Sequence, residues 1–335
     1  MADQKQKIRL GIIGCGIIAS EAHVPALERL TDRFAVTALC NRTRPKAEAL
    51  ARRLGLGAGS IWQDWERMLE EARVDAVLIC LPIELNYPVS QSAAASGRHV
   101  LCEKPIGQSN EEARAAAGLS GRYGVTYMVA EDCHYMPSYA KAAELVKQGA
   151  VGRPVVMSWN MLRFMDTADK YARTLWRINH VYPGGYVLDG GVHFVHVLQM
   201  MAGKVVSVKA ETLSIEPLLG KVDTAFALLR HESGVLTSLN MSWHTRDQSD
   251  SMLRIFGTGG SLLAGSDKII RVTAEGKTEE VPFQNEDDYY IQLIDFHRAV
   301  TTGEPPAVSA EMAAHDVAVI LAILESAERN RPVMI

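Results

Sequence analysis

The sequence contains no hydrophobic run long enough to cross a membrane. Its longest apolar stretches, around residues 76–83 and 317–324, fall well short of the roughly 18–20 residues that a spanning helix needs. The first nine residues are polar, and no apolar signal segment follows them. These absences predict a chain that does not enter a membrane and that works in the cytoplasm.

Cysteine and charge are scattered too evenly to indicate a specialised class. The five cysteines form no CxxC pair and no spaced quartet, which is typical of reduced thiols in a cytoplasmic protein. Lys and Arg number 35 against 39 Asp and Glu, with no block of one sign. We therefore expect no nucleic-acid partner. The length of 335 residues and the 47% hydrophobic content suit a globular protein of two domains.

The first 130 residues alternate between strand-like and helical patterns. Short apolar runs lie at residues 8–13, 35–40, 76–81, 99–102 and 126–130. Helical stretches separate them at residues 21–30, 45–54, 65–72, 88–96 and 110–123. Strands that are apolar on both faces and joined by helices are typical of a parallel sheet covered on each side. Residues 1–130 are therefore predicted to form a doubly wound α/β Rossmann domain.

Residues 131–335 show a different order. Helical patterns at 138–148 and 185–201 flank a long extended run at 153–164. Six strand-like runs separated by turn signals follow, at residues 205–213, 224–230, 235–243, 252–256, 269–273 and 279–283. Consecutive strands with tight turns predict an α+β domain with a large open antiparallel sheet. Helices at 287–302 and 310–329 end the chain, and the last helix is a candidate to pack back on the N-terminal domain.

A glycine-rich turn follows the first predicted strand and opens a helix. It has the GxGxxA pattern and consists of Gly14, Gly16, Ile17, Ile18 and Ala19 around Cys15. The first glycine allows the tight turn, the second lets the backbone approach a pyrophosphate, and the alanine permits close packing of helix and strand. In this βαβ context the pattern predicts a dinucleotide site.

The end of the second predicted strand favours NADP(H) over NAD(H). An NAD-preferring site usually carries an acidic residue about 20 residues after the glycine turn. Here the chain reads Asn41-Arg42-Thr43-Arg44-Pro45-Lys46 instead, with no carboxylate. A guanidinium suits a 2′-phosphate. Asn41, Arg42 and Lys46 are the predicted contacts, and solvated charges at a helix start are the alternative.

Two further segments carry chemistry. Glu103-Lys104-Pro105 follows the predicted strand at residues 99–102, at the sheet edge where open α/β sheets bind ligands. Asp189, His193 and His196 are spaced to share one helix face. That face indicates a histidine acid/base oriented by an aspartate. A metal site of these three residues is disfavoured, since no HExxH pattern appears. A satisfied polar patch is the remaining alternative.

Taken in order, these motifs and the Trp176-Arg177 pair ahead of Gly184-Gly185 resemble the Gfo/Idh/MocA family of oxidoreductases over the whole chain. The resemblance implies that Lys104 contacts the nicotinamide and the reacting oxygen, that His193 is the acid/base, and that Asp189 positions substrate and imidazole. It also implies further cofactor contacts at Leu81, Pro82, Glu103, Trp176, Arg177 and Tyr289. Asn86 is predicted to be another cofactor contact. In this family the large sheet commonly forms a dimer or tetramer interface, so a homo-oligomer is expected.

The substrate implied by the resemblance is a sugar, cyclitol or related polyol that exchanges a hydride with the nicotinamide. His196 and the Pro82–Asn86 segment depart from the usual family pattern and leave the particular sugar open. Arg163 and His196 are predicted substrate contacts, and Asn86, Asp166, His180 and Tyr182 also favour a polyhydroxylated ligand. The alternatives are a non-catalytic dinucleotide sensor and a reductase of a non-sugar carbonyl such as a dihydrodiol or tetrapyrrole.

Overall fold

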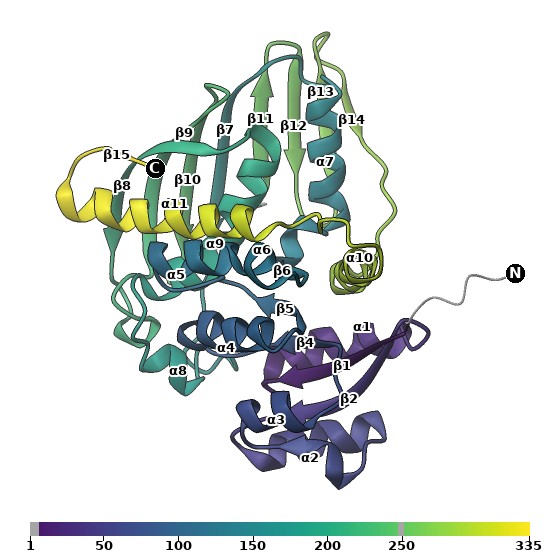
Figure 1. Cartoon of the computed structure of the whole chain (residues 1–335). Helices are drawn as coiled ribbons and strands as arrows, with labels where there is room; N and C mark the ends of the chain where they lie inside the picture. Colours follow the sequence, from purple (N-terminus) through teal and green to yellow (C-terminus); the bar gives the residue numbers. More distant parts are fainter. Residues whose placement is uncertain (1–6, 247–250) are drawn as a thin grey trace, which may run out of the picture. The chain divides into compact units, whose positions relative to one another are not determined.

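The structure, a computed structural model, describes residues 7–246 and 251–335, which divide into two compact units (Figure 1). The first unit contains the chain up to Glu131 together with residues 287–314. The second contains residues 132–286 and 315–335. None of the helices in the described ranges is long and apolar enough to cross a membrane.

In its described part, the first unit is built on a six-stranded parallel sheet in the order β3-β2-β1-β4-β5-β6. The strands are β1 (Ile8–Ile13), β2 (Phe34–Cys40), β3 (Ile61–Trp62), β4 (Ala76–Ile79), β5 (His99–Glu103) and β6 (Tyr127–Ala130). Every residue of β4 and β6 is buried, as expected for strands covered on both faces. The predicted Rossmann sheet is confirmed.

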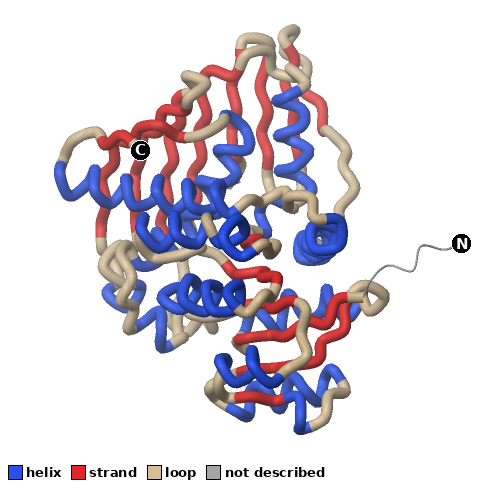
Figure 2. The backbone as a smooth tube through the Cα atoms, in the orientation of Figure 1, coloured by secondary structure: helices blue, strands red, loops and turns tan. Residues whose placement is uncertain are grey.

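Several helices of this unit connect consecutive strands (Figure 2). They are η1 (Ala19–His23), α1 (Val24–Arg29), α2 (Arg44–Leu54), η2 (Ala58–Ser60), α3 (Trp65–Glu71), α4 (Ile83–Ala95), α5 (Asn110–Ala117), α6 (Leu119–Tyr123) and α10 (Asp288–Thr302). The sequence predicted that α4 begins at Pro88, because proline favours a first turn. The structure begins it five residues earlier and keeps Pro88 inside the helix.

Helix α10 belongs to the first unit, whereas the sequence analysis placed residues 287–302 in the second domain. Its apolar face, with Leu293 and Phe296, is completely buried. The helix packs against α1 and η1, and the guanidinium of Arg29 lies 3.9 Å from the centre of the Tyr290 ring. Burial of this face accounts for the return of the chain to the first unit.

The second unit is built, in its described part, on a nine-stranded sheet in the order β14-β13-β12-β11-β7-β10-β9-β8-β15. The strands are β7 (Pro154–Leu162), β8 (Val205–Leu213), β9 (Thr224–His231), β10 (Leu236–Ser242), β11 (Leu253–Gly257), β12 (Gly260–Ala264), β13 (Ile269–Thr273), β14 (Thr278–Glu280) and β15 (Val333–Met334). The sheet is mixed, because β7 and β10 pair in parallel while the other pairs are antiparallel. The predicted large antiparallel sheet is confirmed, apart from this one parallel pair.

Helices cover one face of this sheet (Figures 1 and 2). They include α7 (Pro137–Lys147), α9 (Gly185–Ala202) and most of α11 (Ala310–Arg329). The unit also contains the short helical segments α8 (Leu175–Ile178), η3 (Asp132–His134) and η4 (Pro217–Leu219). Strand β9 alternates accordingly, with Ala227 and Leu229 buried and Phe226 and Leu228 exposed. The sheet therefore has one packed face and one open face.

Candidate active site

The glycine turn after β1 leaves room for a ligand at one of its two glycines. Gly14 has φ +98°, and a Cβ there would overlap the carbonyl oxygen of Cys80. A Cβ on Gly16 would meet no atom within 4 Å. Open space at the second glycine is what a dinucleotide pyrophosphate requires, so the turn fits such a cofactor. Burial raises the pKa of Cys15 to about 12, which keeps this thiol neutral beside the expected phosphates.

The residue where an NAD-specific site would place a carboxylate is Asn41. Its Oδ1 accepts a hydrogen bond from the N–H of Cys15 at 2.9 Å, and its Nδ2 donates to the carbonyl of Thr43 at 2.9 Å. The amide therefore ties the end of β2 to the glycine turn without adding negative charge. Arg44 pairs with Glu48 at 2.9 Å, as the solvated-charge alternative predicts. Within the described residues, no carboxylate pairs with Arg42 or Lys46.

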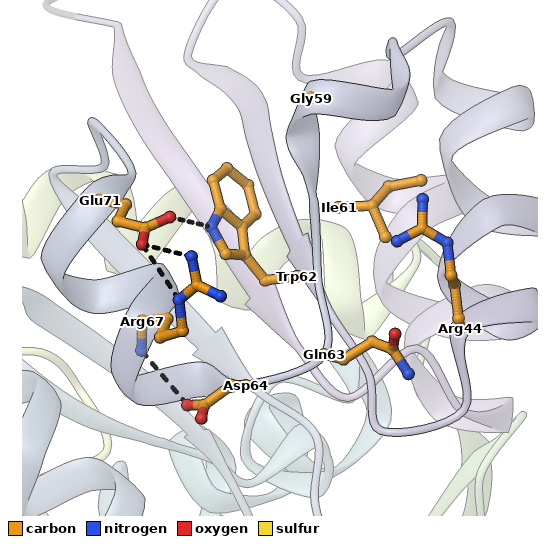
Figure 3. Close-up of a pocket in the computed structure, with 8 residues that line it drawn as sticks. All are labelled: Arg44, Gly59, Ile61, Trp62, Gln63, Asp64, Arg67 and Glu71. Carbon is orange, nitrogen blue, oxygen red and sulfur yellow. Dashed lines mark hydrogen bonds and ion pairs between the residues drawn. The ribbon is translucent and has the colours of Figure 1, made fainter.

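A polar hollow of about 380 Å³ lies along β3 and is lined by side chains from α3 and from the start of α2 (Figure 3). Trp62 Nε1 donates to Glu71 at 3.4 Å, and Glu71 also pairs with Arg67 at 2.7 Å. Gln63 donates to the carbonyl of Arg42 at 3.1 Å and so fixes the backbone that carries this cation. The polar side chains that line the hollow are therefore engaged by other protein groups, and one of them, Gln63, holds the backbone of Arg42 in place.

The Glu103–Pro105 segment is held in place by buried hydrogen bonds. Glu103 Oε1 lies 2.7 Å from Nε2 of His23, and Oε2 accepts the N–H of Lys104 at 3.2 Å. The amide of Asn86 donates to the carbonyls of Glu103 and Pro105, at 3.0 and 2.8 Å. Glu103 and Asn86 thus fix the backbone on either side of Lys104, and their direct contact with a cofactor stays a prediction.

Two predicted cofactor contacts lie near these segments within the first unit. Leu81, next to Pro82 at the start of α4, lies beside the glycine turn, with a methyl carbon 3.2 Å from the position of a Cβ on Gly14. The Tyr289 ring on α10 meets the His23 ring edge-on at 4.9 Å. The predicted cofactor residues of this unit therefore lie at or near the carboxyl ends of β1, β2, β4 and β5, apart from Tyr289 on α10.

In the second unit, α9 carries the three polar residues of the predicted helix face, and each has a partner on another segment. Asp189 pairs with Arg177 of α8 at 2.7 Å. His193 Nδ1 lies 3.3 Å from Oδ1 of Asp132 on η3. His196 is 1% exposed, and its Nδ1 lies 2.8 Å from Asp316. The face is therefore a set of ion pairs and hydrogen bonds to three different segments.

The surroundings of His196 argue against the predicted contact with substrate. Its second ring nitrogen, Nε2, lies 2.9 Å from Nδ1 of His134. Asp316 in turn accepts a hydrogen bond from Gln199 at 2.7 Å. Both ring nitrogens of a buried imidazole are thus engaged by the protein. Arg163 is exposed after β7, and its substrate contact stays a prediction.

Arg177 is a permanent cation beside Asp189. Burial opposes its charge, but the Asp189 carboxylate and its hydrogen bond outweigh burial and raise the pKa of Arg177 above its usual value. The guanidinium also lies 4.0 Å from the centre of the Trp176 ring. Trp176 and Arg177 were predicted to contact the cofactor, and these contacts stay predictions. In the structure the guanidinium of Arg177 holds Asp189.

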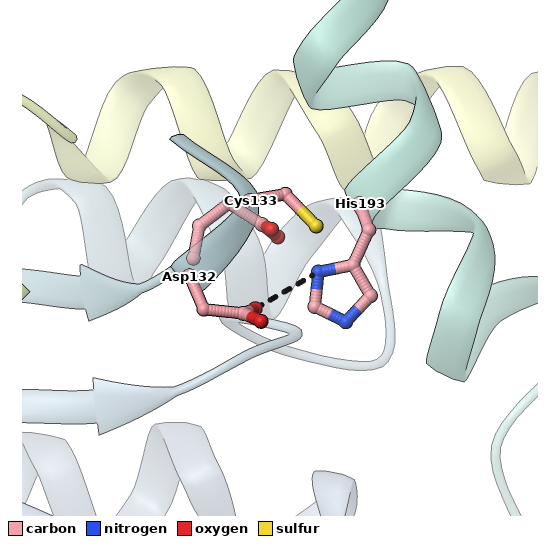
Figure 4. Close-up of side chains that lie close together, drawn as sticks. Asp132, Cys133 and His193 are labelled. Atoms are coloured by element: carbon pink, nitrogen blue, oxygen red, sulfur yellow. Dashed lines mark ion pairs between the residues drawn. The ribbon is translucent and has the colours of Figure 1, made fainter. Parts of the chain in front are cut away.

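Three neighbouring residues that the sequence analysis did not single out are Asp132, Cys133 and His134. They form the η3 turn, which begins two residues after the end of β6, and Asp132 and Cys133 face His193 (Figure 4). The signal was present, because three chemistry-bearing side chains follow a buried strand at the edge where open α/β sheets bind ligands. Their pairing with α9 required the tertiary structure.

Comparisons with known proteins define the class. Residues 8–131 match the oxidoreductase family with an NAD-binding Rossmann fold, and residues 139–263 match the GFO/IDH/MocA C-terminal domain. The chain is an NAD(P)-binding oxidoreductase, and it belongs to the Gfo/Idh/MocA family. The resemblance inferred from the motifs is confirmed.

Individual relatives cover nearly the whole chain. A D-xylose 1-dehydrogenase (NADP(+)) of Haloferax volcanii is 31% identical, over 96% of this chain and 98% of that protein. A myo-inositol 2-dehydrogenase of Thermotoga maritima is 25% identical over 91% of each. The crystal structure of an oxidoreductase from Thermotoga maritima superimposes with a TM-score of 0.92 at 36% identity, over 98% of each chain.

Proposed function

We propose that the protein is an NADP(H)-dependent dehydrogenase that interconverts a hydroxyl and a carbonyl group of a sugar, cyclitol or related polyol. The observation that carries the proposal is the pairing of His193 with Asp132, at 3.3 Å, on a family scaffold that binds a nicotinamide dinucleotide. Relatives named as xylose and inositol dehydrogenases support the substrate class.

The Asp132–His193 pair suits proton transfer. An ionised carboxylate only accepts hydrogen bonds, so Asp132 holds a proton on Nδ1 and leaves Nε2 to take one. In oxidation, Nε2 of His193 removes the proton of the reacting hydroxyl, and Asp132 stabilises the imidazolium that forms. In reduction, Nε2 returns that proton to the carbonyl oxygen. When bound, the nicotinamide supplies the acceptor or donor of the hydride.

Lys104 has the role that the family resemblance implies, that of a cationic donor to the reacting oxygen. Its backbone is fixed on both sides by Glu103 and Asn86, which supports a defined position for its side chain. Arg42 and Lys46 are the proposed contacts of the 2′-phosphate, because Asn41 offers no carboxylate to repel it.

Self-association through the open face of the large sheet is part of the proposal. Register pairs Phe256 with Val156 and Val156 with Leu236, so these three exposed side chains form a row across β11, β7 and β10. Leu228 on β9 is 64% exposed. Such a patch favours a homodimer or homotetramer, since monomers rarely expose contiguous apolar surface. We further propose a cytoplasmic location for this oligomer.

A cofactor and substrate screen tests the proposed function. NADPH and NADH are titrated by fluorescence, and turnover is then measured over aldopentoses, aldohexoses and inositols with the tighter cofactor. We expect turnover of at least one polyol and a loss of about 10²- to 10⁴-fold for His193→Ala, with cofactor affinity retained.

His315→Asn is the matched control, because this imidazole bonds to the carbonyl of Val205 and has no proposed role in the reaction. It should keep wild-type turnover. Cofactor binding without turnover of any polyol would instead favour a dinucleotide sensor, and full activity of His193→Ala would remove its assignment as the acid/base.

A further inference from the structure

Three side chains with different ligand atoms converge in the second unit. Asp132 and Cys133 come from η3 and His193 comes from α9, and we call them the His193 cluster (Figure 4). Their carboxylate oxygen, thiol sulfur and imidazole nitrogen lie within 4.8 Å of one another. Asp132 Oδ1 and His193 Nδ1 lie 3.3 Å apart. The cluster is thus a ready set of mixed O, S and N donors.

This donor set has the chemistry and nearly the geometry of a zinc site. Zn²⁺ binds Cys sulfur at about 2.3 Å and His nitrogen or carboxylate oxygen at about 2.0 Å, so tetrahedral ligand atoms lie about 3.3–3.5 Å apart. The observed spacings require only small side-chain movements. A harder cation such as Mg²⁺ would not select a thiolate.

The His193 cluster is also accessible to a metal ion, whereas the alternative ligand set on α9 is engaged by other side chains. The side chains of His193 and Asp132 are 18% and 19% exposed, so an ion can reach them without opening the core. The alternative site of Asp189, His193 and His196 is not assembled in this way. Asp189 is paired with Arg177, and His196 is held by Asp316 and His134. The donors gathered around His193 are those of η3.

We propose that the His193 cluster binds Zn²⁺, or another cation of similar softness, and that the bound metal inhibits the enzyme. The metal binds Nδ1 of His193, the sulfur of Cys133 and a carboxylate oxygen of Asp132. The thiol releases its proton to solvent, and the proton on Nδ1 moves to Nε2. Nε2 then has no lone pair with which to accept a proton from a substrate hydroxyl. Binding stands on the cluster alone, whereas inhibition rests on the proposed function.

Cobalt provides a spectroscopic test of binding that needs neither cofactor nor substrate. Co²⁺ is titrated into the full-length protein while the near-ultraviolet thiolate-to-cobalt charge-transfer band is recorded, and Zn²⁺ is then added as a competitor. We expect a band that saturates at one equivalent, disappears with Zn²⁺ and is accompanied by release of one proton per metal. No band in the wild-type protein would overturn the proposal.

Variants assign the band to the cluster. Cys133→Ala should abolish it and weaken Zn²⁺ binding about tenfold or more, since loss of even an outer-shell partner costs 10- to 100-fold. Asp132→Asn keeps the thiol and should retain a weaker band, which covers the case of a misfolded Cys133→Ala. Cys80→Ala is the control, because Cys80 is the other half-buried cysteine, and this variant should keep the wild-type cobalt band and Zn²⁺ affinity. A band that survives in Cys133→Ala would overturn the assignment.

Inhibition is measured on the active enzyme. Zn²⁺ should inhibit turnover over the same concentration range in which it displaces Co²⁺, a chelator should restore activity, and Cys133→Ala should require about tenfold more metal. Metal binding in a protein that oxidises no polyol would leave the site in place and remove the proposed function. Turnover that is insensitive to Zn²⁺, with no cobalt band, would remove the metal site alone.

Discussion

Replacing Arg42 with alanine is expected to weaken NADPH binding about 10- to 100-fold while leaving NADH binding nearly unchanged. In the described residues the guanidinium of Arg42 has no carboxylate partner, and Gln63 fixes its backbone through a 3.1 Å hydrogen bond. Hydrogen bonds to charged groups contribute about 1.5–3 kcal/mol. At about 1.4 kcal/mol per factor of ten, losing the contact with a 2′-phosphate gives the stated range.

Arg44 provides a matched control two residues away. Its guanidinium is paired with Glu48 at 2.9 Å, and both side chains are substantially exposed. An exposed pair of this kind contributes about 0.3–0.5 kcal/mol to stability. Arg44→Ala should therefore leave the affinities for both cofactors within about threefold of the wild-type values.

The assay is a fluorescence titration of each variant with NADPH and NADH at two salt concentrations. The loss in Arg42→Ala should shrink at high salt, because screening weakens the wild-type contact that the variant lacks. Equal losses in Arg42→Ala and Arg44→Ala would refute the assignment of Arg42 to the 2′-phosphate. A parallel loss of NADH affinity in Arg42→Ala would refute it as well.

Three other predictions follow from single features of the fold. Gly14→Ala should lower the free energy of unfolding by about 2 kcal/mol or more, because φ is +98° and a Cβ would overlap a carbonyl oxygen. Gly16→Ala should instead keep the free energy of unfolding within about 1 kcal/mol of the wild-type value and weaken cofactor binding. Urea unfolding and cofactor titration of both variants distinguish these effects, and equal losses of stability in Gly14→Ala and Gly16→Ala would contradict the prediction. Leu228→Glu on the open sheet face should shift the oligomer toward monomer in analytical ultracentrifugation, whereas Leu218→Glu, at an exposed position on η4, should not. Burial lowers the pKa of His231 in the folded protein. The contribution of this histidine to the free energy of unfolding should therefore be fully present above about pH 6.5 and decrease below it, where the unfolded chain takes up a proton first. A free energy of unfolding that rises at lower pH, measured by urea unfolding, would contradict this.

The main features of the fold could be predicted from the sequence because its local patterns agree with its tertiary structure. Strands β8 (Val205–Leu213) and β13 (Ile269–Thr273) match the predicted ranges, because the apolar residues in each strand pack against the covered face of the sheet. Strand β3 was not predicted because a strand of two residues is too short to show an alternating pattern. Strand β12 was not predicted because the glycines at its start indicate a turn. The parallel pairing of β7 with β10 depends on long-range register, which no local pattern encodes.

The candidate site could be predicted only where one segment carries its own signal. The glycine turn and the α9 face were found in this way. Asp132 was missed because its partner, His193, lies 61 positions further along the chain and meets it only after folding. His23 was missed for the same reason, since its contact with Glu103 spans 80 positions.

A double-mutant cycle on Asp132 and His193 tests whether the carboxylate of Asp132 acts through His193 in proton transfer. Hydride transfer is followed by NADPH absorbance in the wild-type protein, Asp132→Asn, His193→Ala and the double variant, with cofactor affinity measured in parallel. If Asp132 acts through His193, the double variant is no slower than His193→Ala, because residues that act as a unit are not additive. Losses that multiply in the double variant would contradict the account.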